Sequence, residues 1–490
     1  MPILIVVNDP KQWPLQIPNV EVVDARSYLS RPEYSEMRGV KLFNLCRSYR
    51  YQSSGYYVSL LAEARGHKPL PSVTAIQDLK SQSMVRMVSE ELEELIQTSL
   101  APIQSRKFAL SVYFGRNMAK RYARLAMHLF NVFPAPLLRA QFVRDKRWVL
   151  RSLTAIPASE VPDSHRPFVV QVATEHFAGR GGRVRRRNRA RYDVAILCNS
   201  GDPVPPSDEK ALAKFVKAGE SLGLAVERIG RDDYARLAEF DALFIRETTA
   251  VNHYTYRFSR RASSEGLVVI DDPESIVKCA NKVYLAEILA RHNVPIPRTI
   301  VVHRDNVGSI AETLGFPCVL KKPDSAFSLG VTKVNTQEEL CEQIKRLLAE
   351  SELVVAQEFL PTTFDWRIGI LDRRPLYACK YYMAPNHWQI IRHDGAGKRR
   401  YGNWETLPVE LAPARAVRVA LKAANLVGNG LYGVDVKQSG KDFYVIEVND
   451  NPNVDSGVED AVLRQELYHR IMGVLLWRIE QRKAWLGNHD

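Results

Sequence analysis

Blocks of apolar residues recur along this chain, and the spacing within each block separates expected strands from expected helices. Apolar runs of roughly four to seven residues, rich in Val, Ile and aromatics, are typical of buried strands, whereas apolar positions three or four residues apart predict helices. The first third of the chain mixes both patterns, which predicts a small α/β domain. Its expected strands are 3–7, 20–23, 40–45 and 107–113, and its expected helices are 56–65, 90–99 and 117–130.

The alternation becomes more regular after residue 191. Ser207 is expected to cap a helix over 207–222, because Asp208 and Glu209 follow it in the first turn, where acidic side chains complement the helix dipole. Strands that alternate with helices are typical of a parallel, doubly wound unit. We expect its strands at 192–198, 224–229, 242–246 and 267–270, followed by a helix from about 281 to 292.

In the C-terminal half the predicted strands come in pairs separated by helices, which is the pattern of an α+β domain. The chain contains no G-x-x-x-x-G-K-[ST] sequence, so a P-loop nucleotide domain is excluded. The expected strands are 298–302, 317–322, 353–360, 365–371, 376–383, 432–436 and 443–449, and the expected helices are 340–349 and 414–427.

Size and composition are those of an ordinary globular protein of two to four domains. The chain has 490 residues, of which 46% are hydrophobic and 25% charged. No run of about 18 apolar residues predicts a membrane span, and the opening residues 1–9 resemble a strand more than a signal peptide. The six cysteines are scattered and form no Cys-x-x-Cys pair, which favours a reducing, cytoplasmic setting.

The net charge of +13 is concentrated in part in residues 180–191, which hold seven arginines and no acidic residue. Such a run is typical of a solvated linker, and contact with a polyanion stays open. No aromatic residues are interleaved for base stacking, which argues against nucleic acid. We therefore expect an N-terminal α/β domain of unknown role at 1–178, an arginine-rich linker at 179–191, a doubly wound unit at 192–280 and a nucleotide domain at 281–490.

Two of the last predicted strands carry a set of oxygen ligands. Glu447 and Asn449 are two residues apart on one strand, so their side chains point to the same face, which Asp435 can reach from the neighbouring strand. Carboxylates on an apolar sheet are costly unless a cation lies between them, and Mg²⁺ prefers such ligands together with phosphates. The alternative, a surface hairpin with solvated acids, is disfavoured because the flanking residues are apolar.

Further residues fit a nucleoside triphosphate. Lys282 opens a helix and Lys321 ends a strand, so two ammonium groups could clamp phosphate oxygens. Taken singly, such lysines are more often plain surface residues. The small-residue loop 324–330 could cover phosphates, and the next strand could present its backbone to an adenine edge. The loop residues are Ser325, Ser328 and Gly330, the strand residues are Gln357, Glu358, Phe359 and Leu360, and Arg367 lies on the strand after them.

Together with the Asp435, Glu447 and Asn449 set, these residues resemble the ATP-grasp superfamily, and most closely its RimK-type branch of ligases that add glutamate to an acceptor. The resemblance runs from about residue 192 to the C-terminal helices. It implies an α/β and α+β multidomain fold: the N-terminal α/β domain, a pre-ATP-grasp doubly wound unit at 192–280, then an ATP-grasp fold at 281–490. Within the last, the lid would span about 298–360 and the core about 361–490.

By residue-wise match, Lys282 and Lys321 look like the phosphate and adenine-site lysines. The loop 324–330 looks like the mobile phosphate loop, and 357–360 looks like the adenine hinge. Arg246 resembles the arginine that faces the acyl substrate. The match departs from the family at the Asn449-x-x-Pro turn and in the basic segment 386–400. That segment contains His387, Trp388, Arg392, His393, Arg399 and Arg400; it is either a solvated loop or a closure over an acidic substrate.

The resemblance implies ATP and Mg²⁺ as cofactors, with two ions and Mn²⁺ as a substitute. The expected chemistry is a carboxylate-amine ligation through an acyl phosphate, with Arg367 stabilising the oxyanion of the second step. The expected partners are an acidic amino acid such as glutamate and an amine of a peptide, protein or small molecule, while a homo-oligomer stays open. Two other functions remain: an ATP-binding regulatory or scaffold protein, and an ATP-grasp phosphotransferase.

Overall fold

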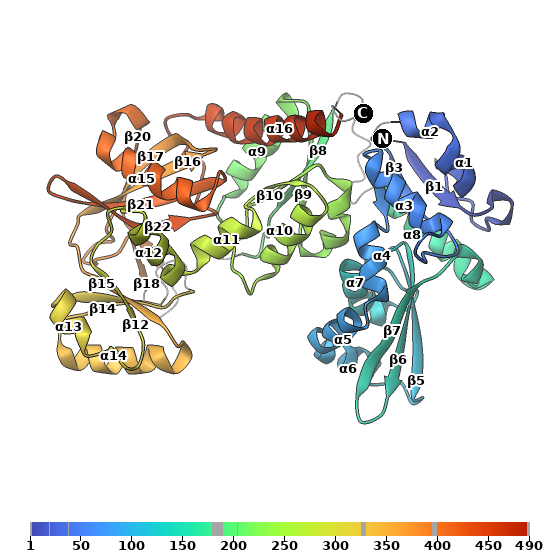
Figure 1. The fold of residues 1–490 in the computed structure, drawn as a ribbon, viewed down its shortest axis with the longest axis horizontal. Helices are drawn as coiled ribbons and strands as arrows, with labels where there is room; N and C mark the ends of the chain where they lie inside the picture. Colours follow the sequence, from blue (N-terminus) through green and yellow to red (C-terminus); the bar gives the residue numbers. More distant parts are fainter. Residues whose placement is uncertain are drawn as a thin grey trace. The chain divides into compact units, whose positions relative to one another are not determined.

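The structure is a computed structural model that describes residues 2–18, 20–37, 39–178, 190–202, 204–324, 330–393 and 399–487. The chain divides into two compact units, drawn in Figure 1. Unit 1 is Met1–Asn188 with Gly230–Glu239, and unit 2 is Arg189–Ile229 with Phe240–Asp490. Each is described below by itself. Among the described residues, no helix has the length and apolar character that crossing a membrane requires.

Unit 1 combines a parallel sheet with a smaller antiparallel one. The parallel sheet has the order β2-β1-β3-β4, and the antiparallel sheet has the order β5-β6-β7. Helices α5, α6 and α7 pack beside the antiparallel sheet, and their apolar side chains form one core with both sheets. The strands are β1 Ile3–Val7, β2 Glu21–Asp24, β3 Lys41–Asn44, β4 Lys68–Leu70, β5 Lys107–Tyr113, β6 Leu137–Arg144 and β7 Trp148–Ala155.

Two helices of unit 1 differ from their prediction. The helix expected at 117–130 is α7 Ala123–Val132, because Phe114 and Gly115 turn the chain with φ values of 46° and 77° and Asn117 then bonds back to the Ser111 carbonyl at 2.7 Å. The helix expected at 90–99 is two helices, α5 Gln82–Glu91 and α6 Glu93–Leu100, that meet at Leu92. Local periodicity did not reveal these breaks.

Part of unit 1 is repeated in unit 2, and three helices start 200 residues later in the second copy (54 and 254, for example). The helices α3 Ser54–Ala64, α4 Val73–Lys80 and α5 correspond to α10 Tyr254–Ser264, α11 Pro273–Ala280 and α12 Lys282–Arg291. The Ser59 hydroxyl donates to the Pro71 carbonyl at 2.7 Å, and the Ser259 hydroxyl donates to the Asp271 carbonyl at 2.6 Å. The parallel sheets also share one strand order. The chain therefore contains an internal structural repeat.

The repeated half of unit 2 is the parallel sheet β11-β10-β8-β9. Its strands are β8 Tyr192–Leu197, β9 Leu224–Ile229, β10 Ala242–Ile245 and β11 Val268–Ile270. Helix α9 Glu209–Ser221 begins at the Asp208 carboxylate, which accepts from the Ala211 backbone N–H, so the cap lies one residue after the predicted Ser207. The C-terminal helix α16 Gln465–Gly487 lies alongside α9 (Figure 1).

The remainder of unit 2 holds two antiparallel sheets. The first, with the order β12-β15-β13-β14, packs against α13 Ser309–Leu314 and α14 Gln337–Glu350, within the range expected for the lid. The second has the order β20-β17-β16-β21-β22 and is covered by α15 Ala414–Val427 (Figure 1). The strands are β12 Thr299–Val302, β13 Cys318–Lys321, β14 Val331–Val334, β15 Val354–Glu358, β16 Phe364–Leu371, β17 Arg374–Tyr382, β20 Trp404–Leu407, β21 Leu431–Ser439 and β22 Asp442–Asn449.

Candidate active site

A row of charged side chains crosses the central sheet of unit 2. Arg367 in β16 lies directly opposite Asp435 in β21, which lies directly opposite Glu447 in β22. The Arg367 guanidinium donates to both oxygens of Asp435, from Nη2 at 2.9 Å and from Nε at shorter range. At the other end, the Nζ of Lys282 pairs with Glu447 at 2.9 Å. The register therefore presents two adjacent carboxylates, flanked on each side by a cation, on one face of the sheet.

Gly433 makes room for this row. A Cβ at this position would lie 2.9 Å from the Cδ of Arg367 and 2.6 Å from the Cβ of Pro452, closer than real Cβ contacts. Asn449 is the cross-strand partner of Gly433 and donates from Nδ2 to its carbonyl at 3.2 Å. Because the amide nitrogen is used in this way, the amide oxygen is the Asn449 group that can ligate a metal.

Burial and neighbouring charges shift the pKa values along the row. Burial raises the pKa of Asp435, and the Arg367 guanidinium opposes that shift. Burial would also raise the pKa of Glu447, but the ammonium groups of Lys282 and Lys321 outweigh it and lower the pKa. Burial lowers the pKa of Lys321 to about 8. The two carboxylates are suited to exchanging their present cationic partners for a metal ion, and the ammonium groups of Lys282 and Lys321 are suited to binding phosphate.

A narrow cleft of about 130 Å³ lies between the first antiparallel sheet and this row. Lys321 Nζ donates within it to the Gln357 side chain at 2.7 Å, and Lys437 pairs with Asp365 at 2.7 Å. Trp388 and Phe359 pack edge to face at 5.8 Å between centroids, which gives the cleft an aromatic wall. The lining includes Lys282, Lys321, Gln357, Glu358, Phe359, Leu360, Asp365, Asp435, Lys437 and Glu447.

Most residues predicted for the nucleotide therefore meet in one cleft. Gly330 adopts a positive φ of 74°, and its carbonyl accepts from the Lys322 backbone N–H at 2.9 Å. Ser325 and Ser328 lie outside the described residues. Asp365 and Lys437 were missed by the sequence reasoning. The sequence pattern that could have identified them is a spacing of two residues. Asp365 is two residues before Arg367 and Lys437 is two residues after Asp435, so each points to the same sheet face as its neighbour.

The oxygen ligands fit a magnesium ion that shares its coordination with phosphates. A metal site made by protein side chains alone would need at least three His, Cys, Asp or Glu residues close together, and the described residues contain no such group. Asp435, Glu447 and Asn449 supply two carboxylates and an amide oxygen, and Mg²⁺ is commonly held by one or two carboxylates plus the phosphates of a substrate. The donor set is therefore suited to Mg²⁺ with a nucleotide.

A second, larger cavity of about 870 Å³ shares Asp435 and Glu447 with the first, and Arg367 lines this second cavity alone. One wall of this cavity is the turn after β22, residues 449–455, in which Asp450 directly follows Asn449. Burial raises the pKa of Asp450 to about 7. The sequence reasoning missed this wall, although the Asn449–Asp455 stretch stood out as a departure from the family.

Arg246 does not line either cavity; it lies behind the turn. Its side chain is 1% exposed and donates to four acceptors: the Ser207 hydroxyl, the Asn451 amide oxygen and the carbonyls of Pro206 and Pro452. These bonds use the guanidinium to hold the turn against the N-terminal side of α9. Arg246 is thus placed to position the turn, and its expected contact with the acyl substrate stays a prediction.

The basic segment 386–400 is described in part. Trp388 and Ile390 line the cleft, and His387 hydrogen-bonds the Gln389 side chain at 3.1 Å. The backbone forms a hairpin, β18 Ile391–His393 with β19 Arg399–Tyr401. The side chains of Arg392, His393, Arg399 and Arg400 lie outside the described residues. The expected closure over an acidic substrate stays a prediction.

Comparisons with known proteins match the two parts of the chain separately. The model of the RimK-like ATPgrasp N-terminal domain matches residues 25–172, and the model of the ATP-grasp domain matches residues 279–453. An alpha-aminoadipate–LysW ligase of Saccharolobus solfataricus is 25% identical over 263 residues, which are 51% of this chain and 90% of that protein. A probable alpha-L-glutamate ligase of Vibrio vulnificus is 24% identical over 229 residues, 46% and 73% of the two chains. The crystal structure of a D-alanine–D-alanine ligase from Bacillus anthracis gives a TM-score of 0.45 at 17% identity, covering 59% of this chain and 99% of that one.

Proposed function

We propose that this chain, which belongs to the ATP-grasp superfamily and carries a RimK-like ATP-grasp N-terminal domain, joins an acidic amino acid such as glutamate to an amine through an acyl phosphate. The observation that carries the proposal is the row Arg367, Asp435, Glu447 and Lys282, because it borders both the narrow cleft that holds Lys321 and the larger cavity. The names of the relatives, which are ligases of glutamate and alpha-aminoadipate, support the acidic amino acid.

ATP would lie in the cleft with its base near the backbone of Glu358–Leu360 and its phosphates toward Lys282 and Lys321. Two ammonium groups on different elements can hold phosphate oxygens from two sides. Asp435, Glu447 and Asn449 would hold Mg²⁺, with two ions expected and Mn²⁺ as a substitute. When bound, the metal neutralises the charge that develops on the transferred phosphoryl group.

The substrate carboxylate attacks the γ-phosphorus, and ADP leaves. The amine nitrogen then attacks the acyl carbon, the bond from that carbon to the phosphate oxygen breaks, and an amide and phosphate result. Arg367 is the group we assign to the oxyanion of the second step, because it lines the larger cavity beside Asp435 and its guanidinium offers several N–H donors.

Trapping with hydroxylamine tests this function. The full chain is incubated with ATP, Mg²⁺ and single amino acids that include glutamate, and both ADP and hydroxamate are measured. Hydroxamate formed in step with ADP supports the ligase. A stable phosphorylated product without hydroxamate indicates the phosphotransferase, and ATP binding without turnover indicates the regulatory protein.

A pair of variants locates the chemistry. Arg367→Lys keeps the charge but loses the fork, so hydroxamate formation should fall at least tenfold. Arg374→Lys changes an exposed arginine at the start of the next strand and should leave it unchanged. Equal rates in the two variants would contradict the role of Arg367.

A further inference from the structure

The larger cavity is acidic beyond the metal ligands. Five further carboxylates line it, and Arg367, which is already paired with Asp435, is the one cation among its described lining residues. Behind the turn after β22, Arg246 offsets part of this charge, although its own donors go to neutral acceptors. The five acidic residues are Asp208, Asp324, Asp450, Asp455 and Glu459.

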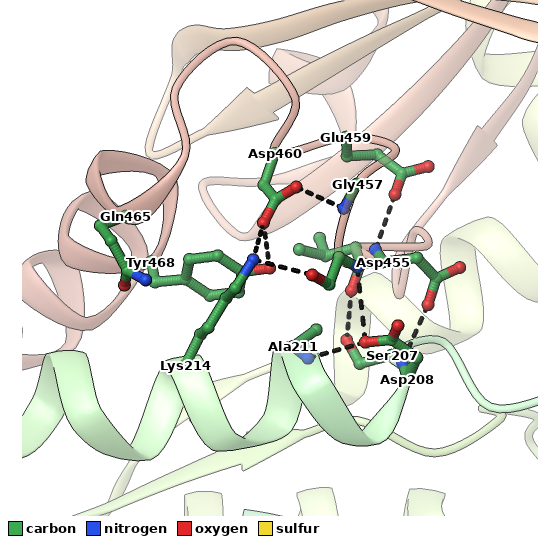
Figure 2. A network of polar contacts seen from close by, with 12 residues as sticks. Ser207, Asp208, Ala211, Lys214, Asp455, Gly457, Glu459, Asp460, Gln465 and Tyr468 are labelled. Carbon is green, nitrogen blue, oxygen red and sulfur yellow. Dashed lines mark hydrogen bonds and ion pairs between the residues drawn. The ribbon is translucent and has the colours of Figure 1, made fainter.

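Three of these carboxylates are held in fixed positions (Figure 2). Asp208 caps α9 through the Ala211 backbone N–H at 2.7 Å. Asp455 accepts from the Asp208 backbone N–H at 2.8 Å, and Glu459 accepts from the Asp455 backbone N–H at 2.7 Å. Such contacts to backbone N–H groups keep the acids in place. The wall is therefore a preorganised set of oxygen acceptors for a cationic ligand.

Asp450 points to a missing positive partner. Its side chain is 8% exposed and lines the cavity, and Thr249 hydrogen-bonds to the carboxylate. Its Oδ2 nevertheless has no hydrogen-bond partner among the described residues. A buried carboxylate oxygen without a donor is costly. A ligand that brings an N–H donor and a positive charge would remove that cost.

Aromatic side chains complete the cavity. Trp404 lines it yet remains 51% exposed, and Tyr381 lines it while its hydroxyl donates to Glu459. Aromatic faces beside carboxylates are suited to ammonium groups and to the methylenes that carry them.

We propose that this cavity binds the amine substrate and that this amine carries a second positive charge, as an aliphatic diamine or polyamine does. This rests on the proposed ligase function. The attacking nitrogen first releases a proton to solvent, then bonds to the acyl carbon, and its next proton leaves with the departing phosphate. The distal ammonium takes no part in bond making and stays against Asp450 and Glu459. An anionic amine would face like charges from the same wall.

Three amines of matched chain length test the proposal. The full chain is given ATP, Mg²⁺, the amino acid with the largest hydroxamate yield, and 1,4-diaminobutane, 1-aminopentane or 5-aminopentanoate, whose distal groups are positive, neutral and negative. Amide product is measured by mass spectrometry. We expect kcat/KM for the diamine to exceed that for each of the others at least tenfold. Equal values, or a preference for 5-aminopentanoate, overturn the proposal, while hydroxamate formation in the same protein leaves the ligase function standing. No hydroxamate with any amino acid refutes both.

Two variants link the preference to the cavity. Asp450→Asn and Trp404→Ala should each lower the ratio of diamine to aminopentane kcat/KM at least fivefold. Trp477→Ala is the matched control, because Trp477 is equally exposed at 51% and lies on α16 outside this cavity. Because Trp404 is a surface residue, its variant gives a folded protein even if Asp450→Asn does not. An unchanged ratio in Trp404→Ala contradicts this placement of the amine.

Discussion

Replacing Lys321 by methionine tests the nucleotide cleft most directly. The Lys321 side chain is 8% exposed, lines the cleft and donates to Gln357 at 2.7 Å. A hydrogen bond to a charged group contributes about 1.5–3 kcal/mol. ATP should therefore bind about 10- to 150-fold more weakly to Lys321→Met.

The same change should leave folding stability nearly constant. Burial lowers the pKa of Lys321 from 10.5 to about 8, so holding this charge inside costs about 3 kcal/mol, which the variant recovers. Against this, the Gln357 oxygen loses its donor, at a cost of about 1–3 kcal/mol. The two effects nearly cancel, so the free energy of unfolding should change by no more than about 2 kcal/mol. Weaker ATP binding would then not reflect unfolding.

Isothermal titration calorimetry at pH 7 and pH 9 supplies the measurement. Because the folded pKa is about 8, the free protein loses the Lys321 proton between these values, and wild-type affinity should fall while Lys321→Met shows no such fall from this group. Lys322→Met is the control, since the Lys322 ammonium pairs with the exposed Glu350 at 2.7 Å. ATP affinity within twofold of wild type in Lys321→Met, or an equal loss in Lys322→Met, would refute the reasoning.

Three further changes test other parts of the molecule. Glu447→Gln should abolish Mg²⁺-dependent ADP formation, whereas Glu410→Gln, at an exposed site, should not; activity near wild type in Glu447→Gln rules out the metal site. Arg246→Ala should lower the free energy of unfolding by roughly 3 kcal/mol or more in urea denaturation, because four buried acceptors lose their donors; an unchanged unfolding curve would return Arg246 to a substrate role. Burial lowers the pKa of His176 from the usual 6.5 to about 4, so its contribution to stability is complete above pH 6.5 and falls by about 3 kcal/mol toward pH 4. His176→Phe should remove the decline between about pH 6.5 and 4.5 in the unfolding free energy, a range in which Glu239, whose pKa falls from 4.5 to about 2, contributes little.

Local patterns were sufficient for much of the active-site sheet. Period-two spacing put Glu447 and Asn449 on one face, and the strand register puts Asp435 and Glu447 opposite each other. A strand's alternation is a property of the backbone, so it can be seen in a few consecutive residues. A few consecutive residues also show that no P-loop is present. They show as well that Lys282 begins a helix and that Lys321 ends a strand.

Long-range relations needed the folded chain. The internal repeat shares only scattered identities, such as Ser59 with Ser259 and Gly66 with Gly266, because many sequences satisfy one pattern of caps, buried positions and turns. The helix predicted at 117–130 begins only at Ala123 in the structure. A turn held by the hydrogen bond from Asn117 to the Ser111 carbonyl overrides the local helical spacing.

The role of each charged side chain was also decided by tertiary contacts. Arg246 has the same strand-end position whether it faces a substrate or supports a turn, and only the distant residues Asn451 and Pro452 direct its guanidinium behind the wall. Asp450 follows a predicted metal ligand in sequence, yet part of the cavity around it comes from segments more than a hundred residues away, such as 204–208 and 248–252. Sequence by itself determined which chemical groups this protein has and which strand faces carry them. The tertiary structure decided which of those groups meet, because burial and pairing energies depend on neighbours that are remote along the chain.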